Sequence, residues 1–264
     1  MDAIRRSINT PSVCLDILAQ FIDQRLPVLH KGAPRQLTTK DVLILTIFVA
    51  KSGIPWRCLQ PCLASQMVTW HLVYRRFKSW VSKNLLEQAY QHILSLYYTR
   101  RILRKPINVM FTDTTFIKSI FGRDCVGPSP VDRARRATKL SVLVDDLGIP
   151  YACTYHPANK SDCRILRHTL HSTYLKGMLT NVWLSADKGY NTATCRQWVN
   201  DFGMKDAILP STQHFRRTIV ENVFAWLDGY RRLIVRYDQQ VATFRSFHCL
   251  ALSVLTHRRL KGLS

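Results

Sequence analysis

Two aspartates stand directly after short apolar runs, where a rigidly held metal ligand is expected. Residues 107–112 (INVMFT) lead into Asp113, and residues 182–186 (VWLSA) lead into Asp187. A short apolar run bounded by proline or polar residues predicts a buried strand, which would hold an aspartate at its exit firmly at the sheet edge. Taken alone, Asp113 is more simply explained as a cap of the following turn. The second aspartate in the same setting favours a shared site.

The elements that must position these aspartates predict an α/β fold with a ribonuclease-H-like mixed sheet and flanking helices. Three strands, a helix, a fourth strand and another helix follow one another, and the first and fourth strands are neighbours in such a sheet. Asp113 and Asp187 would therefore converge. The predicted strands are 107–112, a candidate at 116–121, 139–144, 149–155, 182–186 and 207–209, and the predicted helices are 161–176, 192–202, 216–236 and 244–260.

A third carboxylate would have to come from a later helix, and Glu221 is the candidate. Three carboxylates in a basic groove suit phosphoryl transfer by two metal ions about 3.5 to 4 Å apart. Hard oxygen ligands select Mg²⁺ or Mn²⁺. In this interpretation Asp113 bridges both ions, Asp187 holds one and Glu221 holds the other. Alternatively, Glu221 and Arg217 form a surface ion pair on one helix face, worth about half a kcal/mol or less.

Residues 1–105 predict a helical N-terminal region, and residues 106–264 the catalytic domain. Apolar residues at helical spacing predict helices at about 11–26, 39–51, 66–84 and 85–104, with Gly53 ending the second. The third carries a basic face with Arg75, Arg76 and Lys78. A helix-turn-helix-like module that presses cations onto phosphates fits this pattern, and an ordinary bundle with a solvated basic face fits it equally well.

The charge balance points to a polyanion as partner. The chain has 38 Lys and Arg against 17 Asp and Glu, a net charge of +21, spread along its whole length. Nucleic acid is the first candidate and an anionic membrane the second. The longest apolar stretch, residues 42–50, is too short to span a bilayer, which disfavours a membrane role.

The cysteines and the N-terminus indicate an intracellular protein. The eight cysteines follow no disulfide or zinc pattern, because no second ligand pair accompanies Cys58, Cys62 and His71. The N-terminus has no apolar core followed by a small-residue cleavage site. We therefore expect reduced thiols and no signal peptide.

Several sequence blocks resemble the core motifs of DDE-type insertion-sequence transposases, specifically the group numbered as family five. They are TDTTFIKS, RATKLSVLVDDLGIP, NKSD, LSADKGYNT and the segment RRTIVENVFAWLDGYRRLIVRYDQQVATFRSF. The blocks SGIPWRCL and TWHLVYRRFKSW resemble the helical region that precedes that core. The resemblance is collinear from about Leu37 to Leu255.

This resemblance implies an acidic triad of Asp113, Asp187 and Glu221 that uses Mg²⁺ or Mn²⁺ to hydrolyse DNA at transposon ends. The freed 3′-hydroxyl would then attack target DNA. The implied partners are double-stranded DNA, as inverted repeats and as target, and further copies of the chain in a homo-oligomer. The implied location is on DNA in the bacterial cytoplasm or nucleoid.

The segment around the last acid departs from the family signature of Tyr, Arg, Glu and Lys. Arg217 and Glu221 match, but the Tyr position falls on His214 or Phe215 and the Lys position on Asp228. Asp228 lies about 10.5 Å along the helix from Glu221, too far to share a metal ion, and directs negative charge toward DNA. Arg231 and Arg232 are candidates to compensate. The 33 residues between Asp187 and Glu221 (188–220) are also few for this group.

These departures leave two alternatives to an active transposase. One is a catalytically impaired or domesticated relic that only binds DNA, and the other is a ribonuclease-H-like nuclease without recognition of transposon ends. The candidate DNA-binding residues are Arg75, Arg76, Lys78, Arg135, Arg136, Lys139, Lys188, Arg217, Arg231 and Arg232.

Overall fold

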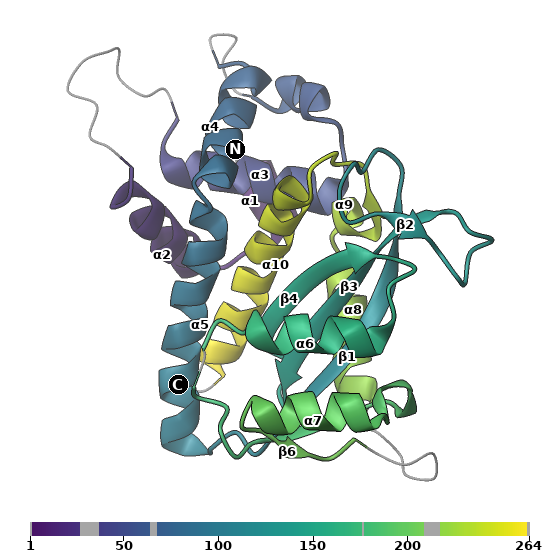
Figure 1. The fold of residues 1–264 in the computed structure, drawn as a ribbon. Coiled ribbons are helices and arrows are strands. Elements are labelled where there is room, and N and C mark those ends of the chain that lie inside the picture. The colour runs from purple at the N-terminus through teal and green to yellow at the C-terminus, as the bar shows by residue number, and fades with distance from the viewer. Residues whose placement is uncertain (1, 27–36, 64–67, 176, 209–216, 263–264) are drawn as a thin grey trace.

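The computed structural model describes residues 2–26, 37–63, 68–175, 177–208 and 217–262 (Figure 1). Up to residue 104, the described residues form helices and the turns beside them. The predicted helices of this region are confirmed within that range, and a further short helix precedes them. The elements are α1 (Asp2–Ile8), α2 (Ser12–Asp23), α3 (Thr39–Ser52), the 3-10 helix η1 (Trp56–Cys62), α4 (Trp70–Ser82) and α5 (Leu85–Arg104).

The ends of α3 show how local sequence sets a helix boundary. The Thr38 hydroxyl accepts a hydrogen bond from the backbone N–H of Asp41, and the Asp41 carboxylate accepts one from the backbone N–H of Thr38. This reciprocal cap satisfies two donors that a helix start leaves unpaired. Gly53 ends the helix with φ +71°, a conformation that glycine adopts without steric cost.

A mixed sheet forms the core of the second part of the chain. Its main path runs β4-β3-β1-β5-β6, with β3 antiparallel to β1 and β4, and with β5 parallel to β1 and β6. This is the predicted ribonuclease-H-like order, in which the first and fourth long strands are neighbours. The strands are β1 (Val109–Ser119), β2 (Gly127–Pro128), β3 (Arg136–Asp145), β4 (Pro150–Pro157), β5 (Trp183–Ala186), β6 (Lys205–Asp206) and β7 (Val235–Arg236).

The prediction of two strands at 107–112 and 116–121 is wrong, because β1 runs unbroken through Asp113. β3 pairs with it continuously from Met110 to Lys118. On its other side β5 pairs with β1 only up to Thr112, and β7 pairs with Lys118 and Ser119. Asp113 therefore lies where one neighbouring strand stops, not where its own strand ends.

The later helices keep the predicted order but not all the predicted lengths. α6 (Asp162–His171) ends before the predicted 176, and β6 lies two residues before the predicted 207–209. The predicted single helix 216–236 is three elements, α8 (Arg217–Asp228), α9 (Arg231–Ile234) and β7, because the chain turns at Gly229. The remaining elements are η2 (Lys188–Tyr190), α7 (Ala193–Asp201) and α10 (Val241–Lys261).

The last helix of the predicted catalytic domain packs against the N-terminal helices. α10 lies alongside α5 over much of its length, as the yellow and blue helices in Figure 1 show. Phe244, Phe247 and Leu250 of α10 and Tyr90 and Tyr97 of α5 belong to one continuous buried core. The boundary at 105/106 remains a prediction, since the hydrophobic core crosses it.

Two aspartates at the β3–β4 turn connect α5 to the sheet. The buried Asp145 carboxylate accepts hydrogen bonds from the Tyr97 hydroxyl at 2.7 Å and from the backbone N–H groups of Leu147 and Ile149. Next to it, Arg101, whose side chain is 3% exposed, forms an ion pair with Asp146 at 2.8 Å. The turn is also pressed against α8, because a Cβ on Gly148 would lie 3.2 Å from Val223 Cγ2.

Asp145 predicts a specific dependence of stability on pH. Burial raises the pKa of its carboxyl to about 6, although its backbone and Tyr97 hydrogen bonds lower it. Because the folded-state pKa lies above the unfolded value of about 4, this group favours folding most at low pH and loses about 3 kcal/mol as pH rises from 4 past 6. The free energy of unfolding of Asp145→Asn should therefore rise relative to that of the wild type as pH increases through this interval.

Denaturant unfolding of both proteins at pH 4.5 and pH 8 measures this difference and cancels the titrations that they share. The exposed Asp201→Asn is the matched control, and its difference from wild type should stay within about 0.5 kcal/mol. A difference between Asp145→Asn and wild type that does not change with pH would contradict the prediction.

Among the described residues, no single helix is both long and apolar enough to cross a membrane, and α3 with η1 meets that test only as a pair bent by 119°.

Candidate active site

Asp113 and Asp187 lie at matched positions of two neighbouring strands. β1 and β5 are parallel, and Thr112 pairs with Ala186. Each aspartate is the next residue along its chain, so the two sit side by side where β5 ends. Both are half-buried, which leaves their oxygens within reach of solvent. The predicted convergence of these two acids is confirmed at the level of strand register.

Each aspartate also accepts a hydrogen bond from the backbone N–H that follows it, and Asp187 thereby caps η2. Asp113 Oδ1 accepts a hydrogen bond from the Thr114 N–H at 2.8 Å, and Asp187 Oδ1 accepts one from the Lys188 N–H at 2.6 Å. Asp113 does not cap a turn, as was considered for it, because β1 continues to Ser119; its hydrogen bond lies within the strand. This hydrogen bond does not exclude metal binding, because a carboxylate has about four lone-pair sites.

Asp162 was not among the predicted site residues, yet it lies next to this pair. Its Oδ1 accepts hydrogen bonds from the Thr114 hydroxyl at 2.9 Å and from Lys139 Nζ at 3.2 Å. Burial, and then the nearby carboxylates of Asp162 and Asp113, raise the pKa of Tyr190 well above its usual value. The sequence signal for Asp162 was its place in the NKSD block.

The direction of Thr114 indicates which face of the sheet Asp113 uses. Thr114 bonds to Asp162, the first residue of α6, so its side chain points to the face that α6 covers. Successive side chains of a strand point to opposite faces. Asp113 therefore points to the other face, over which α8 lies (Figure 1). This is the face from which the predicted third acid would have to come.

Glu221 lies on α8, which packs against β1, and its side chain is exposed. Within the described ranges, no three His, Cys, Asp or Glu side chains are gathered closely enough to hold a metal ion. The structure thus brings Asp113 and Asp187 together and places Glu221 on the correct side of the sheet without closing a three-carboxylate cluster.

Asp228 ends α8, two helical turns after Glu221, and is exposed. Partial burial nevertheless raises the pKa of its carboxyl above the usual value. Of the two arginines expected to compensate for it, Arg231 is exposed. Arg232 is buried, and its guanidinium forms an ion pair with Asp238 at 2.9 Å.

The predicted DNA-binding residues divide into exposed and engaged side chains. Arg75, Arg135, Lys188 and Arg231 are exposed, and Arg136 is exposed while donating to the Gly122 carbonyl at 2.6 Å. Lys139 is 4% exposed and bonds to the Lys160 carbonyl and to Asp162. Lys139 and Arg232 therefore have structural roles. Either side chain could contact a DNA phosphate only after breaking its present hydrogen bonds and ion pair.

On α4, Arg76 donates to the Leu37 carbonyl at 2.6 Å and to the Thr39 hydroxyl at 2.8 Å. Lys78 donates to Gln240 and Thr243 of α10 and keeps partial exposure. The side chain of Arg217, together with His214 and Phe215, lies outside the described residues.

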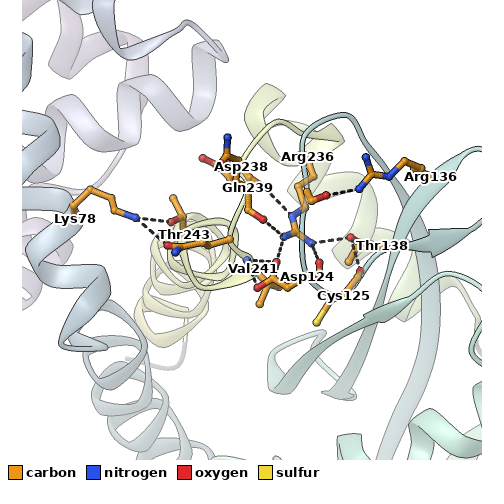
Figure 2. A network of polar contacts seen from close by, with 12 residues as sticks. Lys78, Asp124, Cys125, Arg136, Thr138, Arg236, Asp238, Gln239, Val241 and Thr243 are labelled. Atoms are coloured by element: carbon orange, nitrogen blue, oxygen red, sulfur yellow. Dashed lines mark hydrogen bonds and ion pairs between the residues drawn. The ribbon is translucent and has the colours of Figure 1, made fainter.

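Arg236 is the most extensively bonded side chain that sequence reasoning missed. It is fully buried, and Figure 2 shows it at the centre of a polar network between β7, the segment after β1 and the start of α10. It forms an ion pair with Asp124 and donates to the Thr138 hydroxyl at 3.0 Å and to the Gln239 carbonyl at 2.9 Å. No spacing pattern distinguished it from the other arginines.

Comparison with known proteins identifies the family of the chain that carries this site. The profile of the family described as Transposase DDE domain matches residues 107–255, which include β1, β5 and α8. A putative transposase for insertion sequence element IS402 from Burkholderia cepacia is 28% identical over an alignment of 153 residues, and the match covers 53% of this chain and 72% of the relative.

Two solved transposase structures match this chain at low structural similarity. A Mos1 transposase paired-end complex with left transposon end has a TM-score of 0.29 at 13% identity, over 87% of this chain and 82% of that chain. A piggyBac transposase synaptic complex has a TM-score of 0.38 at 9% identity, over 78% of this chain and 52% of that chain. The family match covers more than half of the 264 residues and includes all three candidate acids, which confirms the resemblance found in the sequence: this chain belongs to the Transposase DDE domain family and is a DNA transposase.

Proposed function

We propose that this transposase cuts phosphodiester bonds at the ends of an insertion sequence with Mg²⁺ or Mn²⁺ and joins the resulting 3′-hydroxyl ends to target DNA. The placement of Asp113 and Asp187 side by side at the end of β5 carries this proposal. Carboxylate oxygens are the ligands that these ions prefer.

In this proposal Asp113 would be a ligand of both metal ions, Asp187 would hold one of them and Glu221 the other. The donor chemistry of the two aspartates fits a divalent ion, and α8 lies over the face to which Asp113 points. When bound, the metal would supply activation of the attacking oxygen and stabilisation of the leaving oxygen. The residues themselves contribute position: β1 and β5 set the spacing of the aspartates, and the Asp162–Thr114 hydrogen bond anchors β1 beside them.

We assign the DNA contacts first to the exposed cations Arg75, Arg135, Arg136, Lys188 and Arg231. The net charge of +21 supports an extended contact with duplex DNA, as inverted repeats and as target. Cutting and joining two ends requires that both be held at once, for which a homo-oligomer on DNA is the simplest arrangement. The site of action in this proposal is the DNA of a bacterial cell.

A second candidate function is a DNA-binding protein without catalysis. The exposed Asp228, at the position where the family signature has a lysine, favours it, as does the lack of a three-carboxylate cluster among the described residues. Incubation of the full chain with a duplex that carries the element's own inverted repeats, with Mg²⁺ or Mn²⁺ and with EDTA, separates the two. Metal-dependent nicks at the repeat ends support the transposase. Tight binding without nicks supports the binding protein, and equal cutting of unrelated duplexes indicates a general nuclease.

The role of α4 can be tested by the salt dependence of DNA binding. Arg75→Ala should reduce the slope of log K against log [salt] by about 1, because one phosphate contact is lost. Arg76→Ala is the contrast, since Arg76 bonds to Leu37 and Thr39; it should lower the free energy of unfolding and leave the slope nearly unchanged. Fluorescence anisotropy between 50 and 200 mM salt measures both slopes. An unchanged slope for Arg75→Ala would indicate that α4 packs within the fold and does not contact DNA phosphates through Arg75.

A further inference from the structure

A cavity of about 600 Å³ lies between the N-terminal helices and the segment from α9 to α10. One wall comes from η1 and α4, with Trp56, Trp70 and Tyr74, and the other from Arg232, Asp238 and the residues that lead into α10. Its volume falls in the range of about 300 to 1,000 Å³ that is typical of sites for small organic groups. None of the three candidate acids lines it.

The first wall is a supported aromatic surface. The Trp56 and Tyr74 ring centroids are 5.4 Å apart, and those of Trp70 and Tyr74 are 6.3 Å apart. Behind them the ring centroids of Trp56 and Phe77 are 5.2 Å apart, and those of Phe77 and Phe247 of α10 are 4.8 Å apart. These rings continue into the core, so the half-buried Trp70 and Tyr74 line the cavity from a packed base. One face of Trp70 is stacked on His71, with the ring centroids 3.6 Å apart.

Cations flank the aromatic wall. Arg57 is exposed on η1. Lys78 crosses from α4 to α10, where Gln240 Oε1 at 3.2 Å and Thr243 Oγ1 at 3.3 Å accept its hydrogen bonds (Figure 2). Both of these acceptors are neutral, so they leave the positive charge of Lys78 uncompensated. An anion at the mouth of the cavity would therefore be attracted to both cations.

The opposite wall contains a buried pair with unused hydrogen-bonding capacity. Arg232 and Asp238 are ion-paired at 2.9 Å, yet Asp238 Oδ2 and Arg232 Nε have no hydrogen-bond partner among the described residues. Buried polar atoms are normally satisfied. Both atoms are buried behind the cavity surface, so a polar group in the cavity would reach them only if the Arg232–Asp238 pair shifts toward it.

We propose that this cavity receives one unpaired nucleotide of a DNA strand. The base stacks against Trp70 and Tyr74, its polar edge faces Asp238 and Arg232, and its phosphate lies between Arg57 and Lys78. Aromatic faces beside cations are the combination by which proteins hold unpaired bases, at about 1 to 3 kcal/mol for each stacked base. The proposal rests on the action of the chain on DNA but not on the metal site.

The test uses the full chain without metal and a single-stranded oligonucleotide that carries 5-iododeoxyuridine, a base that crosslinks to adjacent aromatic side chains under ultraviolet light. Mass spectrometry should locate the crosslink on Trp70 or Tyr74. A crosslink found only on aromatic residues outside the cavity would overturn the proposal. This measurement needs no variant and does not depend on cleavage.

Affinity measurements provide the second arm. The double variant Trp70→Ala, Tyr74→Ala should bind single-stranded DNA about 10- to 100-fold more weakly and bind duplex DNA with little change. Trp183→Ala is the matched control, because Trp183 is 46% exposed on β5, away from the cavity. Equal losses on both DNA forms, or no loss on single strands, would contradict the proposal. Metal-dependent nicking by the wild type together with either result would leave the proposed function standing.

Discussion

Asp113→Asn is expected to lower metal-dependent strand cleavage by about a thousandfold or more, while DNA affinity stays the same or rises. Asparagine keeps the size of the side chain and an oxygen that can still accept the Thr114 N–H hydrogen bond. It removes the charge that would hold a divalent ion, whose electrostatic contribution of several kcal/mol corresponds to three or more decades in rate. Loss of one negative charge also reduces repulsion of the DNA phosphates.

Cleavage of the inverted-repeat duplex on a denaturing gel and affinity by fluorescence anisotropy measure the two effects separately. Asp201→Asn, at the exposed end of α7, removes the same charge away from the strands and serves as the control. Its cleavage rate should match that of the wild type. If Asp113→Asn loses affinity together with cleavage, Asp113 is a structural residue of β1 and the proposed metal site is wrong.

Arg236→Met should cost about 3 to 5 kcal/mol in the free energy of unfolding. Arg236 is fully buried, and its removal leaves the Asp124 carboxylate, the Thr138 hydroxyl and the Gln239 carbonyl without their shared donor. The Asp124 side chain is 47% exposed, so the loss comes mainly from the buried acceptors that are left without a donor, at about 1 to 3 kcal/mol each. The total is a large part of the stability of most domains. Methionine fills most of the volume, so the loss reports the polar network and not a cavity.

Denaturant titration followed by circular dichroism measures this cost. Arg135→Met is the matched control, because Arg135 has a 60% exposed side chain and only a 3.8 Å contact with Asp132; it should change stability by less than about 0.5 kcal/mol. Arg236→Lys should recover only part of the loss, because one ammonium cannot reach all the acceptors of a guanidinium. A cost below about 1 kcal/mol for Arg236→Met would show that the network is dispensable.

The position of Arg236 also connects stability to the site. Ser119 pairs with Arg236 where β7 joins the far end of β1, and the same strand carries Asp113. The network therefore fixes the end of β1, while the Asp162–Thr114 hydrogen bond fixes its middle. Both act on the strand that would have to present Asp113 at a constant distance from Asp187.

Local sequence was sufficient wherever a few neighbouring residues set the outcome. Helical spacing predicted the start of α3 near residue 39 and Gly53 predicted its end, since both signals involve groups only a few residues apart. The apolar runs before Asp113 and Asp187 predicted two adjacent buried strands and therefore the pairing of these acids. The charge of +21 and the collinear motifs predicted a DNA transposase, which the family match confirms.

Only the tertiary structure decided which cations face solvent, where strands and helices stop, and which acids meet. The sequence suggests that Lys139 and Arg232 are surface cations, but both are buried in ion pairs. Lys139 pairs with Asp162, which is distant in the chain, and Arg232 pairs with Asp238, which lies across a turn. β1 continues through Asp113 because β3 pairs with it from Met110 to Lys118, and the packing of α8 against β1 sets the place of Glu221. These outcomes depend on contacts between segments far apart in the chain, whose energies no local pattern contains.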